Sequence, residues 1–465
     1  MPVNSFENYP MSWKTERGEI EKPYYSSIAR KLEEDILSGK LPENTKLPPQ
    51  RELADYLDLN LSTITRAYKL CELKGYLYAV TGRGTFVSPG ISVQDTFIVN
   101  NGKTIELGMI RPFYECNKAV LTASQTVINA PFAVKLLEYT NPLGTKRQLG
   151  AAVKWLDRLG VRVEESNVLI AAGAQNALSV VLISLFSAGD KIAVDEFTYT
   201  NFKGLANLLH VQLVAVEADV SGMSADALRN LCSLSELKGV YLMPTCSNPT
   251  GIFTTMERRL ELADVIKKYG LVAIEDDIYS FLAPDGVKGF MSLIPEHTVH
   301  ICSISKSLCA GLRVAFIAFP GHLRERLTAG MLNINLKAVS LNAEIIAELI
   351  ESKEAERIVC RKIELTKRRC QIYSTYFNQE PPDGLLRFFY WLRLPASMTS
   401  EAFEAYAYQK GVHVLGSHRF AMNGRGKSSY IRLSVTSPET EEELKTALGI
   451  VKGLFDEKRF DEFIV

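Results

Sequence analysis

The sequence predicts an α/β protein with two parts: a small, mainly helical N-terminal unit that ends in a hairpin, and a larger domain built on a mainly parallel sheet. Three observations predict this organisation. The chain has 465 residues, more than one ordinary domain holds. Residues 23–88 show apolar positions at helical spacing, followed by two short strand-like runs. From about Glu106 onward, apolar runs rich in β-branched residues alternate with amphipathic helical stretches, as in parallel sheets covered by helices.

Composition places the chain among folded proteins of balanced charge. Hydrophobic residues make up 46%, and 53 Lys and Arg balance 53 Asp and Glu, which argues against a histone-like binder of polyanions but permits a local basic face. The eight Cys contain no CxxC pair, a pattern that indicates reduced thiols. The longest apolar run, Val180–Phe186, is interrupted by Ser184 and is far shorter than the roughly 20 residues that cross a bilayer. Since the N-terminus also lacks an apolar targeting segment, we expect a cytoplasmic protein that does not span a membrane.

Breakers in the sequence predict the domain boundaries. We expect an N-terminal extension over residues 1–22, a first domain over 23–88 and a large domain over 106–465. The stretch 89–105 contains several Pro, Gly and Asn residues and little periodicity, which predicts a linker. From about residue 333 the pattern becomes more helical and ends in the alternating run SYIRLSV, so residues 333–465 are expected to form a smaller α+β lobe.

The first domain is predicted to contain three helices and a hairpin. Apolar residues at helical spacing predict helices over Ser26–Leu37, Arg51–Leu57 and Thr63–Lys74. The run YLYAVTGRGTFV predicts two short strands around a turn at Gly82 and Gly84. Helix, helix–turn–helix and hairpin, in that order, are the elements of a winged helix-turn-helix, a fold that binds duplex DNA.

Local charge agrees with DNA binding without proving it. Between Asn60 and Gly90 four cations face one acid, which gives this stretch a net charge of +3. The cations are Arg66, Lys69, Lys74 and Arg83. They fall on the third helix and the hairpin, where DNA phosphates would lie. Ordinary solvated helix charges would give the same count.

The segment from Tyr24 to Val87 resembles a GntR-type winged helix over its whole length. The resemblance implies that Arg51, in the R-E-L-A segment, contacts DNA. The turn Asn60-Leu61-Ser62-Thr63 stands where the family usually has S/T-R-x-T, so Leu61 replaces an Arg that often binds guanine. The residues implied to contact DNA are Arg51, Asn60, Ser62, Thr63, Arg66, Lys69, Arg83 and Gly84.

Lys306 is the sharpest chemical signal of the large domain. It follows the apolar run VHICSIS, at a strand end where ligand chemistry concentrates in α/β sheets. Ser303 and Ser305 precede it, and Arg313 follows after one short turn. A phosphate-bearing cofactor that forms a Schiff base needs such a set: a lysine amine for the imine, and an Arg with hydroxyls for the dianionic phosphate. Alone, however, an S-x-S-K run is more often a surface lysine beside a loop.

Two further strand ends carry polar residues suited to an aromatic cofactor ring. Asn248 lies in the turn SNPTG after the run GVYLMPT, where its amide can hydrogen-bond a phenolic oxygen. Asp276 ends the run LVAIEDD, and Tyr279 follows three residues later. A buried carboxylate at this place would keep a pyridine nitrogen protonated, although a strand-end Asp is by itself more often a helix cap.

Three more features point to the same chemistry. A Gly-Ala-Gln turn opens a helix, so the backbone N–H groups of Ala174 and Gln175 would point at a phosphate. Tyr199 is a candidate for stacking on a ring, or else a core tyrosine. Arg432 lies within the apolar run SYIRLSV and needs an anion there, either a ligand carboxylate or a structural Asp or Glu.

Taken in order, GAQ, TY, NPTG, D-x-x-Y, S-x-S-K, GLR and I-R-L-S resemble the fold-type I pyridoxal-phosphate enzymes of the aminotransferase class, from about Glu106 to the C-terminus. The resemblance implies that Lys306 forms the Schiff base, Asp276 bonds the pyridine nitrogen and Arg432 binds a substrate or effector carboxylate. The remaining residues would surround the cofactor: Asn248 and Tyr279 at the ring oxygen, Tyr199 on the ring face, and Ser303, Arg313, Ala174 and Gln175 at the phosphate.

The combination of the two domains resembles the MocR subfamily of GntR-type transcriptional regulators. This resemblance implies a homodimeric, DNA-binding regulator that uses pyridoxal 5'-phosphate to sense an amine, an amino acid or the cofactor itself. The turn SNPTG and the run IEDDIYS look closer to true aminotransferases than to regulators. Two alternatives therefore remain open: an active aminotransferase with an accessory DNA-binding domain, and a DNA-binding protein whose large domain has lost its cofactor and only dimerises.

Overall fold

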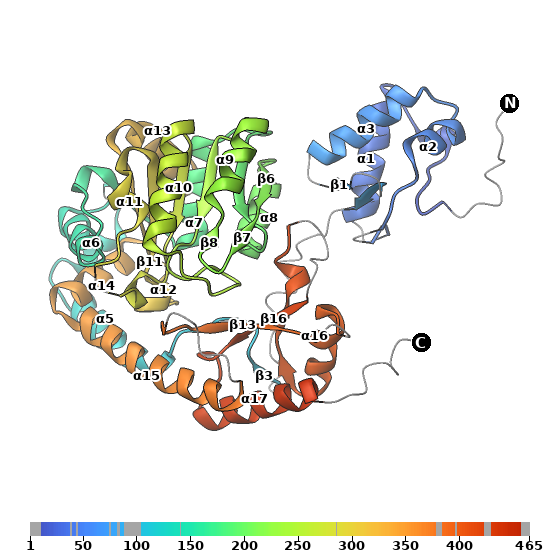
Figure 1. Ribbon diagram of the computed structural model, residues 1–465. Helices are drawn as coiled ribbons and strands as arrows, with labels where there is room; N and C mark the ends of the chain where they lie inside the picture. The colour runs from blue at the N-terminus through green and yellow to red at the C-terminus, as the bar shows by residue number, and fades with distance from the viewer. Residues whose placement is uncertain are drawn as a thin grey trace. The chain divides into compact units, whose positions relative to one another are not determined.

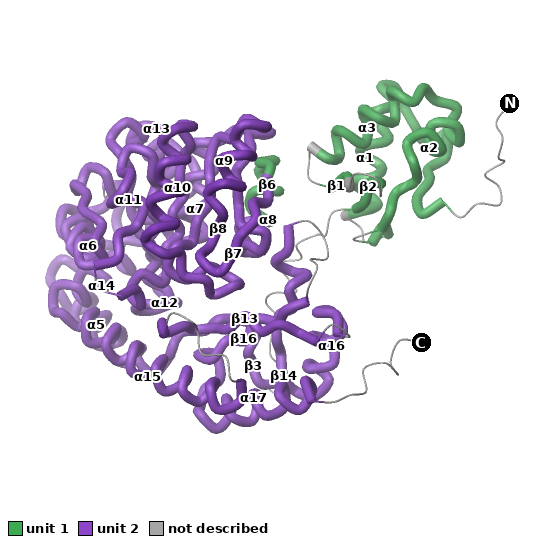
Figure 2. Tube along the Cα trace, in the orientation of Figure 1, with its two compact units in different colours: residues 1–92, 204–212 green, residues 93–203, 213–465 purple. Residues whose placement is uncertain are grey.

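The structure is a computed structural model that describes residues 11–37, 40–42, 45–73, 76–80, 84–87, 104–139, 141–284, 286–377, 384–395, 398–422 and 429–456 (Figure 1). It contains two compact units (Figure 2). The first comprises residues 1–92 with 204–212, and the second comprises residues 93–203 with 213–465. Among the described helices, none combines the length and the apolar character needed to span a membrane.

The N-terminal unit has the predicted order of elements. Its helices are α1 (Tyr24–Leu37), α2 (Gln50–Tyr56) and α3 (Leu61–Leu73), and its antiparallel hairpin consists of β1 (Leu77–Val80) and β2 (Gly84–Val87). Helix α3 begins two residues earlier than expected, because the Asn60 side chain accepts the backbone N–H of Ser62 and caps the helix. Four residues of α3 at helical spacing are fully buried: Ile64, Ala67, Tyr68 and Cys71.

Residues 11–22 also belong to the core of this unit. Trp13 is 5% exposed, and its indole N–H donates to the Asp35 carboxylate at 2.9 Å. Ile20 is buried in the same cluster as Leu32 of α1. The sequence predicts only an extension here, because this segment shows no periodicity.

The large unit is built around a seven-stranded sheet with the order β4-β12-β11-β10-β9-β5-β6. The strands are β4 (Val168–Ala171), β5 (Lys191–Asp195), β6 (Gln212–Val216), β9 (Gly239–Leu242), β10 (Val272–Asp276), β11 (Thr298–Ser303) and β12 (Ala315–Ala318). Strands β5, β9, β10 and β11 are mutually parallel, whereas β12 runs antiparallel to β11 and β4. The predicted apolar runs GVYLMPT, LVAIEDD and VHICSIS form β9, β10 and β11, whereas β12 was not predicted from the sequence.

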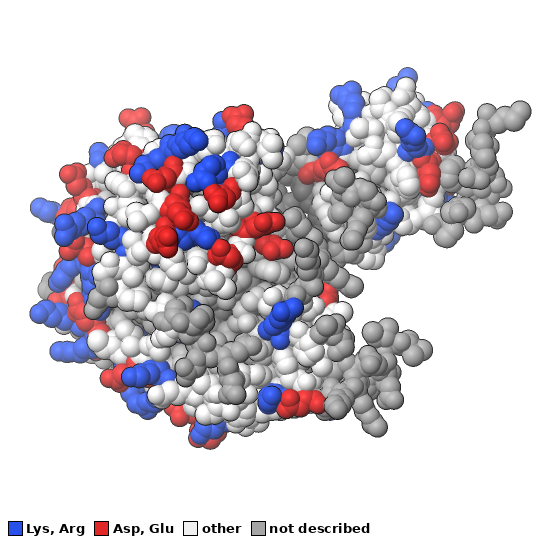
Figure 3. Space-filling model, viewed as in Figure 1, with Lys and Arg blue, Asp and Glu red and all other residues white. Residues whose placement is uncertain are grey.

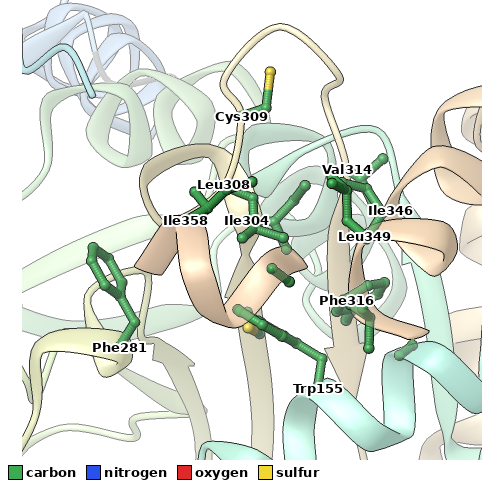
Figure 4. Close-up of a cluster of buried hydrophobic side chains, with 14 of the residues drawn as sticks. Trp155, Phe281, Ile304, Leu308, Cys309, Val314, Phe316, Ile346, Leu349 and Ile358 are labelled. Atoms are coloured by element: carbon green, nitrogen blue, oxygen red, sulfur yellow. The ribbon is translucent and has the colours of Figure 1, made fainter. Parts of the chain in front are cut away.

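Helices cover the sheet, and the described buried side chains between helices and sheet form two large hydrophobic clusters. The helices before the long α15 are α5 (Asn117–Ile128), α6 (Lys146–Arg158), α7 (Ala174–Leu185), α8 (Thr200–Leu208), α9 (Ala225–Leu234), α10 (Met256–Tyr269), α11 (Phe290–Leu293), α12 (Ile304–Ser307), α13 (Arg324–Asn335) and α14 (Ser340–Glu351). In the core, Ile304 and Leu308 lie close to Ile358 of the long helix α15 (Glu354–Tyr376), as Figure 4 shows. The short helix α12 is therefore fixed by buried side chains at both ends.

A smaller lobe follows in the chain. It contains a three-stranded sheet of order β13-β16-β15 and the helices α15, α16 and α17 (Figure 1). The bounds are β13 (Phe389–Arg393), β15 (Leu415–Gly416), β16 (Tyr430–Ser434), α16 (Ser400–Gln409) and α17 (Glu441–Asp456). A separate parallel pair joins β3 (Ile105–Glu106) to β14 (Val412–His413), so the first described strand of the large unit belongs to this lobe.

Candidate functional site

Lys306 lies on the four-residue helix α12, directly after strand β11 ends at Ser303. The Ser303 hydroxyl accepts the backbone N–H of Ser305 at 3.3 Å and caps this helix. Ile304 and Leu308, on either side of Lys306, are completely buried. The backbone around the lysine is therefore held firmly at the carboxyl end of the parallel strands, the edge where ligands bind in such sheets.

The surroundings of Lys306 favour a neutral amine. Its Nζ donates a hydrogen bond to the carbonyl oxygen of Ile110. Burial lowers the pKa of Lys306 to about 7, and the positive charges of Arg432, Lys362 and Arg313 add to this effect. A lysine of this kind is unprotonated in a large fraction of molecules at neutral pH and can act as a nucleophile.

Asp276 ends strand β10, which is adjacent and parallel to β11. The Tyr241 hydroxyl donates to Oδ2 of Asp276 at 2.7 Å. The other oxygen, Oδ1, is buried and has no hydrogen-bond partner among the described residues. Burial raises the pKa of Asp276 to about 6, although the Tyr241 hydrogen bond opposes the rise. One acceptor position of a buried carboxylate is thus not used by any of the described residues, which is uncommon in native proteins.

Arg432 connects the smaller lobe to the large sheet. Its Nη1 donates to Oδ1 of Asn248 at 2.5 Å, and its Nη2 donates to the carbonyl oxygen of Gly108 at 2.6 Å. Its Nε has no partner, and no Asp or Glu of the described residues forms an ion pair with it. Burial lowers the pKa of Arg432 to about 10, so the side chain remains cationic at neutral pH. Of the two anions that the sequence left open, a structural carboxylate is not paired with Arg432 among the described residues.

A candidate anion site, made of groups that can bind an anion, lies where helix α7 begins. Gly173 precedes the helix with a φ of +88°, and the Arg313 guanidinium lies so close that a Cβ at Gly173 would be 2.4 Å from Nη2. Arg313 Nη1 donates to the Ser305 hydroxyl at 3.1 Å, and this hydroxyl lies 3.2 Å from that of Ser303. A helix N-terminus, a guanidinium and two hydroxyls from distant segments thus meet at one point, which is the arrangement that binds a phosphate.

Of the two residues that begin α7, Gln175 is also bonded elsewhere. Its amide donates to the carbonyl oxygen of Asn201 at 3.2 Å, while its side-chain oxygen is buried without a partner among the described residues. Ala174 is the first residue of the helix, so its backbone N–H belongs to the group at a helix start that has no partner within the helix.

Two tyrosines complete the surroundings of Asp276. Tyr199 is half-buried just before α8, and burial, with the nearby charge of Asp276, raises its pKa to about 12. Tyr279 is 2% exposed, burial raises its pKa well above the ordinary value, and its hydroxyl has no hydrogen-bond partner among the residues described. Its ring packs edge-on against Phe388 and Phe389 at 5.7 Å. Both hydroxyls are therefore protonated donors at neutral pH.

Two residues that support this site were not predicted from the sequence. Tyr241 was placed only in a core strand, yet its hydroxyl reaches Asp276; a tyrosine in a buried strand usually has a partner for its hydroxyl, and that was the available signal. Lys362 on α15 is completely buried, and its Nζ donates to the carbonyl oxygens of Lys306 and Leu308 at 3.0 and 2.7 Å. Nothing in the sequence distinguishes Lys362 from a solvated helix lysine.

The N-terminal unit presents a polar face along α3. The exposed residues Ser62, Thr65, Arg66 and Lys69 follow one another at helical spacing and form a single stripe. The Arg66 guanidinium lies over the Tyr25 ring at 4.3 Å, and Lys69 is 3.5 Å from Glu72. Thr65, which donates to Gln50, was not among the predicted contacts. Thr63 is half-buried at the edge of the stripe.

The other predicted DNA contacts lie around this stripe or outside the described residues. Arg51 is exposed on α2, and Gly84 begins β2. Exposed Lys46 lies against Gly84, since a Cβ there would be 2.9 Å from Lys46 Cε, and sequence analysis did not single out this cation. Arg83 lies outside the described residues. Charges of both signs are interspersed over the faces that Figure 3 shows, in keeping with the zero net charge.

Two family models match the chain, one for each unit. Residues 24–87 match "Bacterial regulatory proteins, gntR family", and residues 116–451 match "Aminotransferase class I and II". The uncharacterized HTH-type transcriptional regulator YdeF of Bacillus subtilis (strain 168) is 40% identical over 461 residues, which cover 98% of this chain and 100% of the relative. The 2-aminoadipate transaminase of Thermus thermophilus is 26% identical over 331 residues, 68% of this chain and 80% of the relative.

Solved structures resemble the larger part of the chain. An archaeal alanine:glyoxylate aminotransferase has a TM-score of 0.71 at 22% identity and covers 79% of this chain and 93% of its own. LysN, an α-aminoadipate aminotransferase from Thermus thermophilus, has a TM-score of 0.71 at 22% identity and covers 83% of this chain and 96% of its own. At this level of identity the similarity shows the fold alone, and that fold is the predicted fold-type I architecture.

Proposed function

The chain belongs to the HTH-type transcriptional regulators in which a gntR-family unit precedes an aminotransferase class I and II domain, the MocR-like architecture, and on that premise we propose that its large unit binds pyridoxal 5'-phosphate and senses an amine, an amino acid or the cofactor itself. The winged unit identifies the protein as a DNA-binding regulator. Aminotransferases of class I and II depend on pyridoxal phosphate in general, and whether this chain uses it is the proposal.

One observation carries the cofactor proposal: buried polar groups without partners surround a lysine of lowered pKa. Asp276 Oδ1, the Tyr279 hydroxyl and Arg432 Nε have no hydrogen-bond partner among the described residues, and burial lowers the pKa of Lys306 to about 7. Buried polar groups in native proteins are nearly always satisfied, so this set fits a polar group that the chain itself does not supply. Its donors and acceptors match an aldehyde, a pyridine nitrogen, a phenolic oxygen and a phosphate.

Each residue has a defined task toward that group. When bound, pyridoxal phosphate supplies a reactive aldehyde on an electron-withdrawing ring. Lys306 would hold it covalently, Asp276 would hold the proton of the ring nitrogen, and Arg432 would remain available for a carboxylate. The remaining contacts would be made by Asn248 and Tyr279 at the ring oxygen, Tyr199 on the ring face, and Ser303, Arg313, Ala174 and Gln175 at the phosphate.

Sensing follows from competition for Lys306 and Arg432. An effector amine would displace the Lys306 nitrogen, and an effector carboxylate would pair with Arg432, which already bonds Asn248 of the large sheet. Both contacts favour a closed arrangement of the smaller lobe. The effector can shift this equilibrium only by its difference in affinity for the two states, typically about 1–3 kcal/mol.

An exposed apolar cluster supports the homodimer that we propose. Leu121, Ile128, Val134, Leu137 and Tyr139 are 62%, 56%, 70%, 79% and 92% exposed, and they lie on or beside α5 and the 3-10 helix η4 (Ala133–Leu137). Clusters of this kind mark protein interfaces. A two-fold dimer would also carry two winged units, which could bind the two half-sites of an operator in the cytoplasm.

Real transamination is the second candidate, because the donor set around Lys306 is that of a catalyst as well as of a sensor. One experiment separates the proposals. Pyridoxal phosphate is added to purified protein and to Lys306→Ala, and absorbance, keto-acid release and binding to genomic fragments at fixed salt are followed during an amino-acid titration. A band that needs Lys306, with effector-dependent DNA binding, supports the sensor. Release of many equivalents of keto acid supports the enzyme, and protein that takes up no cofactor refutes both.

A further inference from the structure

A cavity lies in the large unit, close to residues of the proposed cofactor site. Its volume is about 720 Å³, within the range of small-molecule sites. It is bounded by the carboxyl ends of β5 and β9 and by β13 and β16 of the smaller lobe. Lys306, Asp276, Tyr279, Arg313 and Arg432 do not line it. It is therefore separate from the set of residues assigned to the cofactor and its effector.

Aromatic rings form one wall of this cavity. Trp391 and Tyr430 stack with centroids 5.3 Å apart and planes 8° apart. Phe197 packs edge-on against both, at 5.4 and 6.0 Å. All three rings line the cavity and are only partly buried, so their free surfaces face its interior. Such a wall favours an apolar body or a cation placed over a ring face.

The charges of the cavity are mainly negative. Asp195 receives a hydrogen bond from the Ser247 hydroxyl on Oδ2, at 3.1 Å, while its Oδ1 is buried and has no partner among the described residues. Glu196 follows it and is exposed. The Arg387 guanidinium is turned to backbone carbonyl oxygens, to Gly251 at 2.7 Å among others, instead of to these carboxylates.

Asp219, a third carboxylate of the lining, is already neutralised. It lies 2.8 Å from Nη2 of Arg258 and also accepts the backbone N–H of Ser221. Asp195 is therefore the carboxylate with an unused acceptor next to the aromatic wall. An anionic ligand would meet Asp195 and Glu196 at close range, whereas a cation would compensate them.

We propose that this cavity binds an organic cation, an ammonium group carried on an apolar or aromatic body, with the cation at Asp195 and the body against Phe197, Trp391 and Tyr430. The two sites share a wall. Trp391 is the direct partner of Arg432 across the β13–β16 pair, and Ser247 precedes Asn248 in the chain. A ligand in the cavity thus touches the residues that flank the Asn248–Arg432 pair, where it can act as a second effector.

Benzyltrimethylammonium is a suitable probe, because it has no N–H and cannot form an imine with an aldehyde. Full-length protein, with and without pyridoxal phosphate, is titrated by calorimetry and by tryptophan fluorescence. Of the three tryptophans, Trp13 and Trp155 are buried in other clusters, so Trp391 should report the binding. We expect saturable binding of one equivalent, with benzyl alcohol binding at least about tenfold more weakly.

Variants test the assignment of residues. Asp195→Asn and Trp391→Leu should each weaken binding about tenfold, while Asp219→Asn, whose carboxylate is paired with Arg258, should change it less than about threefold. Lys306→Ala should bind the probe as the wild type does, which separates this proposal from that of the cofactor. Undetectable binding, equal binding of benzyl alcohol, or loss of binding in Lys306→Ala would overturn the proposal. Circular dichroism verifies that each variant is folded.

Discussion

Lys362 on α15 donates from one buried ammonium group to the carbonyl oxygens of Lys306 and Leu308. Helix α15 contributes Ile358 and Leu365 to the core of the large sheet and Tyr373 to the core of the smaller lobe. The backbone that carries Lys306 is thus tied to a helix shared by both cores. Burial lowers the pKa of Lys362 to about 8, so its ammonium group begins to lose its proton close to neutral pH.

Lys362→Met should remove this tie and loosen the segment around Lys306. Two buried carbonyl oxygens lose their charged donor, and we expect a loss of about 1–3 kcal/mol in the free energy of unfolding, measured by urea denaturation of the large-unit transition. Lys367→Met, at an exposed position of the same helix, is the control and should change stability by less than about 0.5 kcal/mol. Equal stabilities of the two variants would contradict the assigned role of Lys362.

The reactivity of Lys306 should rise at unusually low pH. Only the neutral amine is acylated, and since the pKa of Lys306 is lowered to about 7, its labelling by acetic anhydride in cofactor-free protein should be half-maximal near pH 7. Lysines with an ordinary pKa of about 10.4 require a much higher pH. Peptide mass spectrometry gives the profile of each lysine. Lys362→Met removes one repelling cation and should move the midpoint of Lys306 upward; a midpoint near 10 in the wild type would show that the amine is not desolvated.

Gly173→Ala should prevent the anion site from forming. A Cβ there would lie 2.4 Å from Arg313 Nη2, so the guanidinium must shift from its place at the start of α7, and the φ of +88° would also be strained for alanine. We expect affinity for pyridoxal phosphate, measured by absorbance titration, to fall at least about tenfold. Gly160→Ala is a matched control, because Gly160 also has a positive φ, of +81°, but has open space around its Cα. A similar affinity in the two variants would argue against phosphate binding at this helix start.

Arg51→Ala and Lys69→Ala should weaken DNA binding by reducing its electrostatic part. If each side chain contacts one phosphate, each variant should make the negative slope of log affinity against log salt less steep by about 0.9. Fluorescence anisotropy with an operator fragment at several salt concentrations measures this slope. Arg30→Ala, an exposed cation of α1 that faces Glu34, serves as the control with an unchanged slope. Should all three slopes agree, the α2–α3 face would not be the DNA-binding face.

Leu137→Asp should weaken the proposed homodimer, because it places a charge in the exposed apolar cluster on α5 and η4. Analytical ultracentrifugation should show a shift from dimer toward monomer, with the dissociation constant of the dimer raised at least about tenfold. Leu234→Asp changes a leucine that is 85% exposed on α9, outside the cluster, and should leave self-association unchanged. A dimer of undiminished stability in Leu137→Asp would place the interface elsewhere.

Local patterns in the sequence predicted most of the fold and the polar residues at strand ends. Fully buried strands such as β9 and β11 appear as continuous apolar runs, and Asp276 and Lys306 follow such runs directly. Strand β3 was not predicted, because it has two residues and pairs with β14 about 300 residues later. The approach of Arg313 to Gly173 and the burial of Lys362 likewise depend on tertiary packing, for which the sequence carries no periodic signal.

The β3–β14 pair attaches the first described residues of the large unit to the smaller lobe. Glu106 accepts hydrogen bonds from its own loop and lies 2.8 Å from Nδ1 of His413. The segment that follows β3 also contacts the candidate site. The Gly108 carbonyl oxygen accepts a hydrogen bond from Arg432, and the Ile110 carbonyl oxygen accepts one from Lys306. A ligand that takes over both cations frees both carbonyls at once. The segment that opens the large unit would then lose its contacts with the same two side chains that register the ligand.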